Sequence, residues 1–134
     1  AAKGIGLAAI QIGVPKRIIV MDISSDKEKK NPMYFVNPVI NNKNSQKSIY
    51  EEGCLSVPNQ FAEIDRPKSC DIEYIDYNGK KENLSADGLL ATCIQHEMDH
   101  LEGILFIDHL SKLKKSMIIK KLSKLKNKED RVVL

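Results

Sequence analysis

The sequence has no apolar run that could cross a membrane. A transmembrane helix needs about 20 consecutive apolar residues, whereas 29% of the residues here are charged and they are spread along the chain. The first residues also lack the basic stretch, apolar block and small-residue cleavage site of a secretory signal peptide. These absences predict a protein of the cytoplasm with no membrane contact.

Cysteine is scarce, and no segment has the composition of a linker. Cys54, Cys70 and Cys93 are an odd number at wide spacing, which fits reduced thiols or a metal ligand better than a disulfide framework. No internal repeat and no Pro/Gly/Ser-rich stretch divides the 134 residues. This length matches the usual size of one domain, roughly 100–150 residues. We therefore expect residues 1–134 to form a single globular domain.

The order of the local patterns predicts an α+β fold. Strands are expected at residues 17–23, 34–40, 48–52, 69–77 and 80–84. The last two flank Asn78 and Gly79, a pair that favours the positive φ angles of a type I′ hairpin turn. From Ser85 the apolar spacing changes to three and four residues, which predicts a helix that stops near Gly103. We expect a mostly antiparallel or mixed sheet packed around this helix.

A second helix, expected over residues 112–128, is rich in lysine. Its apolar residues recur at helical spacing: Leu113, Met117, Ile118, Leu122 and Leu125. This pattern predicts an amphipathic C-terminal helix with a solvated basic face. Because lysine stripes attract phosphate, a transient contact with the ribosome is the alternative. No aromatic residue interleaves with the lysines to stack on bases, so the solvated face is favoured and no specific DNA binding is expected.

The candidate chemistry lies on the first helix. Residues 96–100 read His-Glu-Met-Asp-His, and two histidines four residues apart project from one helix face, where both can bind one metal ion. Glu97 lies beside them, within reach of a water molecule at such a site. A hydrolytic site of this kind needs a third protein ligand and keeps one position open.

Two protease patterns that share this motif do not supply the third ligand. The metzincin pattern requires a histidine where this chain has Phe106. A thermolysin-like site requires a glutamate on a later helix, where only Glu129 near the terminus is available. His109 fits an ordinary surface histidine. Cys54 remains as the candidate.

Three segments resemble the signature motifs of the peptide deformylase family. They are residues 4–11 (GIGLAAIQ), 52–56 (EGCLS) and 95–100 (QHEMDH), in the family's order and at compatible separations. The resemblance extends over essentially the whole chain. Members usually carry a further N-terminal segment with a helix, so the chain is expected to be an N-terminally incomplete catalytic domain. The implied activity is removal of the formyl group from the N-terminal methionine of new polypeptides.

The resemblance also implies the metal centre. Cys54, His96 and His100 would bind one divalent ion, and Glu97 would act as general acid and base. The family is associated with Fe²⁺, for which Zn²⁺ or Ni²⁺ may substitute, whereas residue types alone would suggest zinc. Glu52 and Arg66 would pair and steady the cysteine segment, although the ordinary interpretation of such a pair is a surface salt bridge of small worth.

The substrate contacts are implied in the same way. Gln11 and the backbone N–H of Leu55 would hold the formyl oxygen. The family's methionine pocket would be lined by Ile5, Tyr50, Leu89 and Cys93. The alternative for Cys93 is a small buried thiol of the core. Gly6, next to Ile5, permits close approach of an extended peptide that pairs with this segment.

Two alternatives stay open at this point. A different metallohydrolase, such as a protease, would need a third ligand other than Cys54. A non-enzymatic domain would close a structural zinc site with a fourth protein ligand.

Overall fold

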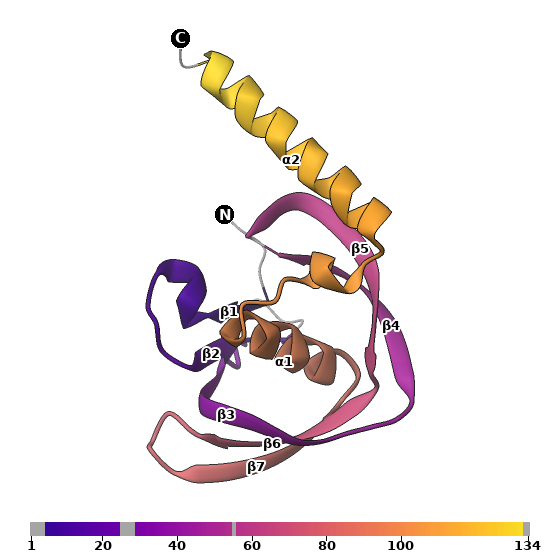
Figure 1. Ribbon diagram of the computed structural model, residues 1–134. Helices are drawn as coiled ribbons and strands as arrows, with labels where there is room; N and C mark the ends of the chain where they lie inside the picture. The colour runs from indigo at the N-terminus through magenta and orange to yellow at the C-terminus, as the bar shows by residue number, and fades with distance from the viewer. Residues whose placement is uncertain (1–4, 25–28, 55, 133–134) are drawn as a thin grey trace.

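Strands come first and helices last in the structure, a computed structural model that describes residues 5–24, 29–54 and 56–132 (Figure 1). The elements are β1 (Gly6–Ala8), η1 (Ala9–Ile12, a 3₁₀ turn), β2 (Ile18–Met21), β3 (Met33–Lys43), β4 (Lys47–Cys54), β5 (Val57–Pro67), β6 (Ser69–Ile75), β7 (Lys81–Asp87), α1 (Gly88–Leu101), η2 (Phe106–His109, a 3₁₀ turn) and α2 (Lys112–Val132). The predicted α+β class is confirmed.

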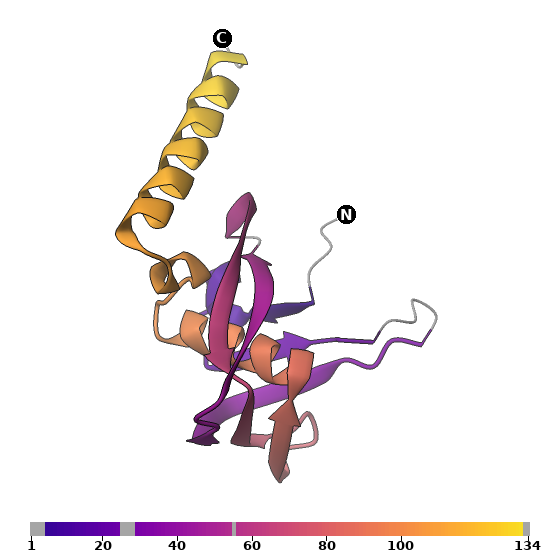
Figure 2. The same cartoon turned by 90° about the vertical axis from the view of Figure 1, so that its right-hand side faces the viewer.

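The strands form two sheets rather than the single sheet expected. One sheet has the order β1-β2-β3-β6-β7, the other consists of β4 and β5, and every pairing within the described residues is antiparallel. The ladder passes from one sheet to the other where Asn44 N–H donates to Ser69 O and Lys68 N–H donates to Gln46 O, both at 2.9 Å. The β4-β5 pair therefore branches off the end of the β3-β6 pair, and α1 contacts both sheets (Figures 1 and 2).

The core lies between α1 and the larger sheet. Side chains from that sheet and the helix pack together, among them Ile19, Met21, Phe35, Ile72, Ala91 and Ile94. A second cluster joins β5, η2 and the start of α2 through Val57, Ile64, Phe106, Ile107 and Ile118. The first cluster fixes α1 on the larger sheet, and the second packs β5 against η2 and α2.

Two strands were not predicted, and the strand expected at 17–23 is confirmed with shorter bounds. β1 and β5 escaped because β1 is short and β5 contains Pro58 and polar residues, which hide the alternation. A strand in a two-stranded sheet tolerates proline because its outer edge needs no partner. The run at 17–23 is shorter, Ile18–Met21, and is buried on one face only: Ile19 is 0% exposed and Val20 is 37% exposed.

The β6-β7 hairpin is confirmed, but its turn is not type I′. Gly79 has a positive φ of 81°, while Asn78 does not. Asp76 N–H donates to Lys80 O at 2.9 Å, which closes a loop of three residues instead of two. The Asp76 carboxylate accepts hydrogen bonds from the N–H groups of Asn78 and Lys80, both at 2.9 Å, and this side chain favours the longer loop.

Helix α1 begins later than expected and ends as expected. Ser85 and Ala86 still pair with β6, so the helix starts at Gly88. It ends at Leu101, and Gly103 follows with a φ of +74°. A positive φ favours glycine, because a side chain there would crowd the backbone.

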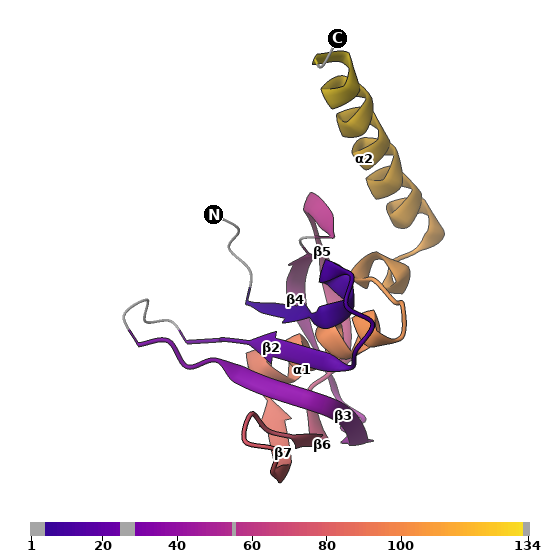
Figure 3. The ribbon, with the colours of Figure 1, turned by 90° about the vertical axis from the view of Figure 1, so that its left-hand side faces the viewer.

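Helix α2 extends away from the two sheets (Figures 1, 2 and 3). The helix itself was predicted, and its apolar side chains are exposed over most of its described length. Ile118 is 8% exposed, whereas Leu113 is 72% and Met117 is 50% exposed. Within the described ranges, no helix is both long enough and apolar enough to span a membrane.

Candidate active site

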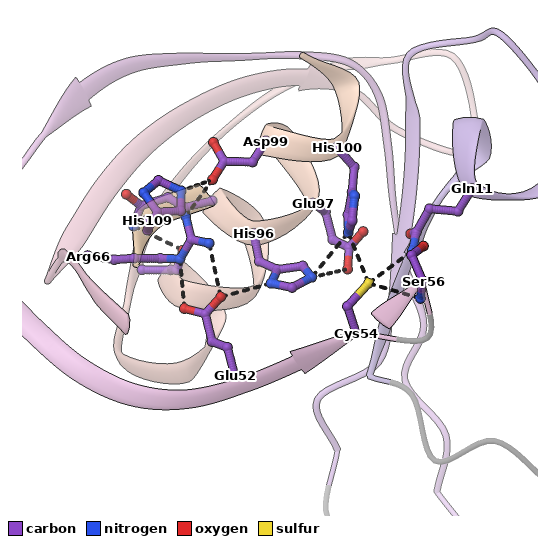
Figure 4. A network of polar contacts seen from close by, with 12 residues as sticks. Gln11, Glu52, Cys54, Ser56, Arg66, His96, Glu97, Asp99, His100 and His109 are labelled. Atoms are coloured by element: carbon purple, nitrogen blue, oxygen red, sulfur yellow. Dashed lines mark hydrogen bonds and ion pairs between the residues drawn. The ribbon is translucent and has the colours of Figure 1, made fainter. Parts of the chain in front are cut away.

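His96, His100 and Cys54 meet beside the buried face of α1 (Figure 4). The Nε2 atoms of the two histidines are 3.2 Å apart, and Cys54 Sγ lies 3.3 Å from His100 Nε2. All three donor atoms lie within 4.8 Å of one another. The fold therefore brings the three predicted metal ligands together, although Cys54 and His100 are more than 40 residues apart in the sequence.

The position of Cys54 depends on the glycine before it. Cys54 is the last residue of β4, where the pairing with β5 shifts register between Gly53 and Cys54. A Cβ atom on residue 53 would lie 2.5 Å from the ring of Phe61 on β5. Glycine at this position lets the two strands stay close while the bulge turns Cys54 toward the histidines.

Hydrogen bonds shift the pKa values of the Cys54 thiol and the His96 imidazole in opposite directions. Burial by itself raises the pKa of the Cys54 thiol, but hydrogen bonds to His100 and His96 outweigh it and lower the pKa to about 5. Burial likewise lowers the pKa of His96, but hydrogen bonds to Cys54 and Glu52 outweigh it and raise the pKa to about 9. At neutral pH Cys54 is a thiolate, which is the form that binds metal.

The donor set fits a divalent metal ion. Sulfur and nitrogen ligands bound at about 2.0–2.3 Å in tetrahedral geometry stand roughly 3.3–3.7 Å from one another. The donor spacings of 3.2 and 3.3 Å are close to that range. In the described part of the chain no fourth His, Cys, Asp or Glu joins this group. Three ligands and an open position are typical of hydrolytic sites, whereas structural zinc sites are closed.

Glu97 brings its carboxylate to this site. The residue is 5% exposed, its Oε1 atom lies 4.0 Å from His96 Nε2, and its Oε2 atom has no hydrogen-bond partner. Burial, opposed by the neighbouring histidines, raises the pKa of the Glu97 carboxyl group. Gly6 on β1 leaves the space for it, since a Cβ atom there would come within 3.1 Å of Oε1. The carboxylate is positioned to accept and return a proton.

Gln11 contacts Cys54 from the other side. Its Nε2 atom lies 3.3 Å from Cys54 Sγ and donates to Ser56 Oγ at 3.1 Å, while its Oε1 atom accepts from Ala8 N–H at 2.8 Å. The amide N–H groups therefore point at the site, and the carbonyl points away from it. Leu55, the other predicted donor, lies outside the described residues.

Glu52 and Arg66 are buried, not a surface pair. Arg66 donates to both carboxylate oxygens of Glu52, at 2.7 and 2.9 Å. Arg66 is 4% exposed and Glu52 is 6% exposed. Glu52 Oε1 also lies 2.8 Å from His96 Nδ1. A carboxylate on one imidazole nitrogen fixes the ring so that the other nitrogen faces the metal. Glu52 thus holds a histidine ligand as well as the cysteine segment, a contact that the sequence does not reveal.

The same network continues to the surface. Arg66 donates to Asp99 Oδ2 at 2.8 Å, and His109 Nε2 lies 2.7 Å from the same oxygen. His109 is exposed, as expected, but it is not an isolated surface histidine. Asp99 is next to His100 in the helix, so this chain of contacts restrains α1 at its metal-binding turn (Figure 4).

A cavity of about 580 Å³ opens beside the three donors. All five predicted substrate residues line it: Ile5, Gly6, Tyr50, Leu89 and Cys93. Cys93 also packs against the core, and burial raises the pKa of its thiol to about 11. Thr92 and Phe61 line the cavity as well and were not predicted. Thr92 could have been predicted, because it lies four residues before His96 on the same helix face. Phe61 could not, because it lies on β5, a strand that the sequence did not predict.

Comparison with known proteins agrees with the geometry. The sequence profile of the Polypeptide deformylase family matches residues 1–116. A peptide deformylase of Pelagibacter ubique is 80% identical over 127 residues, which cover 95% of this chain and 74% of that protein. Among solved structures, peptide deformylase from Ehrlichia chaffeensis has a TM-score of 0.87 and 40% identity, covering 95% of this chain and 76% of that one.

A second solved structure carries an inhibitor. It is peptide deformylase from Ehrlichia chaffeensis in complex with actinonin, with a TM-score of 0.82 and 44% identity, and it covers 91% of this chain and 73% of that one. The sequence identity, and the share of each chain that is aligned, exceed what two proteins with only a shared fold would give. The chain therefore belongs to the peptide deformylase family, the metal-dependent hydrolases that remove the N-formyl group from new polypeptides.

Proposed function

We propose that the deformylase activity of this chain depends on one Fe²⁺ ion held by Cys54, His96 and His100, with Glu97 as general acid and base. The observation that carries this proposal is the convergence of the three donor atoms within 4.8 Å of one another. It is supported by the buried Glu97 carboxylate, whose Oε1 atom lies 4.0 Å from His96 Nε2. One thiolate and two imidazoles suit Fe²⁺ or Zn²⁺, and Ni²⁺ can take the same ligands.

The protein residues divide the chemistry among them. A divalent ion at this site supplies Lewis-acid chemistry, because it lowers the pKa of water toward ~7 and polarises a carbonyl group. The Glu97 carboxylate takes a proton from the attacking water, whose oxygen forms a bond to the formyl carbon. Glu97 then gives this proton to the amine nitrogen as the C–N bond breaks. The products are formate and a free N-terminal amine.

Gln11 stabilises the oxygen that gains charge in this step. The amide N–H groups of its side chain face Cys54, so Nε2 is placed to donate to the formyl oxygen once substrate enters. The backbone N–H of Leu55 is the proposed second donor. Each such donor contributes on the order of 3 kcal/mol to the transition state in comparable sites.

The peptide is held by β1 and by the cavity. β1 is an edge strand of the larger sheet in the described structure, so an extended substrate can add to it beside Ile5 and Gly6. The methionine side chain enters the cavity against Tyr50, Leu89 and Cys93. This arrangement places the formyl group at the metal ligands and leads the rest of the peptide away along the sheet edge.

The place of action follows from the substrate. New formylated polypeptides leave the ribosome in the cytoplasm, where we place this chain as one catalytic domain over residues 1–134. Exposed lysines of α2, such as Lys114, Lys120 and Lys121, provide a basic surface for a transient ribosome contact.

Metal removal and one ligand variant test the proposal. Chelator-treated protein should release no formate from a formyl-Met peptide, and Fe²⁺ added without oxygen should restore more activity than Zn²⁺. Cys54→Ser should lose most of its metal, because a hydroxyl replaces a thiolate. Cys70→Ala, at a core cysteine outside the donor group, is the control and should keep its metal. Full metal content in Cys54→Ser would contradict the ligand assignment.

A further inference from the structure

The short turn η2 contacts the metal-binding helix with two of its side chains. Phe106 is 1% exposed, and its ring stacks on that of His96, with the centroids 6.2 Å apart and the planes at 22°. His109 Nε2 lies 2.7 Å from Asp99 Oδ2. A 3₁₀ turn has three residues per turn, so side chains at positions 106 and 109 lie on the same side of it. The turn therefore presents both side chains to α1.

The turn η2 is held in place by contacts that do not involve His109. Ile107 is 5% exposed and belongs to the apolar cluster of β5, η2 and α2. Two polar contacts close the turn: Leu105 N–H donates to Asp108 Oδ2 at 2.9 Å, and Lys115 pairs with Asp108. The hydrogen bond of His109 differs from these, because it leaves the turn and ends on α1.

From Asp99 the contacts lead to His96 through one arginine. Arg66 donates to Asp99 Oδ2 at 2.8 Å, which is the same oxygen that faces His109, and its other nitrogens donate to Glu52. Glu52 Oε1 lies 2.8 Å from His96 Nδ1. An ionised carboxylate only accepts hydrogen bonds, so His109 Nε2 carries a proton and donates it. One oxygen of Asp99 is therefore shared between two donors.

We propose that His109 is a positioning residue for the metal ligand His96. It acts through the three charged side chains between them, Asp99, Arg66 and Glu52. With the His109 donor present, Asp99 needs only one nitrogen of Arg66, and the other nitrogens stay on Glu52. Without this donor, Asp99 draws the guanidinium toward itself, which loosens the carboxylate that orients the His96 ring. The inference rests on the proposed function, because it takes His96 as a metal ligand.

The expected effect is smaller than that of a residue in contact with the ligand. Removing a group that touches a metal-bound histidine typically weakens metal binding by roughly 10–100-fold. The side chain of His109 is 38% exposed, and three other side chains separate it from His96. We therefore expect Zn²⁺ to leave His109→Ala about 5-fold faster than it leaves the wild type.

The test measures how fast Zn²⁺ passes from the loaded full chain to an excess of chelator at one pH. This rate is a property of the loaded protein, so the proton that His96 releases on binding does not enter it. His109→Gln keeps an N–H donor near the position of Nε2 and should restore a rate close to that of the wild type. Asp108→Ala is the matched control: it breaks the two polar contacts that close η2 but leaves Asp99 its partners, and the rate should not change.

A double-mutant cycle with Glu52→Gln tests whether His109 acts through the network. Glutamine removes the charge that holds both Arg66 and the imidazole of His96. In this background His109→Ala should therefore add little to the rate of Zn²⁺ loss. A histidine that only stabilises the fold would add its full effect of about 5-fold in both backgrounds.

Several outcomes would overturn the inference. A wild-type rate in His109→Ala, or an equal effect in both backgrounds, would show that the network does not carry its influence. A rate in His109→Gln as fast as in His109→Ala would show that the ring packs and does not act as a donor. If His109→Ala does not fold, His109→Leu, which fills the space without a donor, takes its place.

The same measurements separate this inference from the proposed function. A wild-type chain that retains no Zn²⁺ would overturn both, because the metal site itself would then be wrong. Normal retention by the wild type, together with an unchanged rate in His109→Ala, would remove the role of His109 and leave the proposed function intact.

Discussion

The two α-helices have similar apolar spacing in the sequence and opposite surroundings in the structure. α1 lies between the sheets and buries polar residues as well as apolar ones, including His96, Glu97 and His100. α2 extends from the body, and among its described side chains Ile118 alone is buried (Figure 1). Apolar periodicity therefore predicts which face of a helix is apolar, but not whether another element covers that face.

The burial of α1 between the sheets changes the chemistry of its polar residues. Burial raises the pKa of Glu97, and Glu52 fixes the ring of His96. Within the described part of α2, every lysine except Lys115 is exposed, and the charge of an exposed side chain is screened by solvent and salt. Substitutions in α1 or against it should therefore alter chemistry, and those in α2 should alter little in a purified assay.

The largest expected effect is that of Glu97→Ala. Removing a positioned acid-base group typically costs ~10²–10⁴ in kcat. Because Glu97 is not a proposed ligand, the metal content should stay that of the wild type. Formate release and elemental analysis on the same sample measure both quantities, with Lys121→Ala in α2 as the control. Activity within a few-fold of wild type would remove Glu97 from the mechanism.

Gln11→Leu comes next, because it removes one donor and leaves the metal ligands in place. We expect kcat to fall by about 10², with a smaller change in KM, since the donor acts most strongly when charge develops on the formyl oxygen. Steady-state kinetics with one formyl-Met peptide separate the two constants. A change confined to KM would mean that Gln11 only binds substrate.

The third prediction concerns the pH dependence of metal binding. Only a neutral imidazole binds metal, and the pKa of His96 is about 9, so binding must release a proton at any pH below this value. The Cys54 thiol, with its pKa of about 5, is already ionised and adds no dependence there. The apparent affinity of chelator-treated protein for Zn²⁺ should rise about tenfold per pH unit from pH 7 to pH 9.

Glu52→Gln tests the cause of that dependence. Glutamine keeps the shape of the side chain and removes the charge that helps to raise the pKa of His96. The rise of affinity should then end at a lower pH, nearer the ordinary imidazole value of about 6.5. Competition titrations with a coloured chelator give both curves. Identical curves for the variant and the wild type would show that Glu52 does not control this proton.

The smallest effect should come from the exposed face of α2. Leu113 is 72% exposed, so Leu113→Ser should change the free energy of unfolding by less than ~0.5 kcal/mol. The matched substitution in α1 is Ile94→Ala, at a residue 0% exposed, which should cost about 2–5 kcal/mol. Urea unfolding of the two variants compares the helices directly. Equal losses would mean that the Leu113 face of α2 is covered in solution.

What the sequence predicts here depends on how local each pattern is. The β6-β7 hairpin and both helices arise from neighbouring residues, and they are confirmed. The second sheet and β5 depend on pairing between residues far apart, and they were missed. Cys54 could be selected as a ligand by elimination and by family resemblance, but the contacts of Glu52 with His96 and of Asp99 with His109 join residues that no local spacing connects.

The shortness of β1 bears on how many different proteins this enzyme can serve. A three-residue edge strand can hydrogen-bond only a short stretch of an added peptide, and backbone bonds do not depend on the identity of the side chains. In the proposed binding mode, the part of a substrate beyond the methionine pocket is recognised mainly as an extended chain end. Broad tolerance follows, which suits an enzyme whose substrates have one starting residue in common and otherwise the varied sequences of a whole proteome.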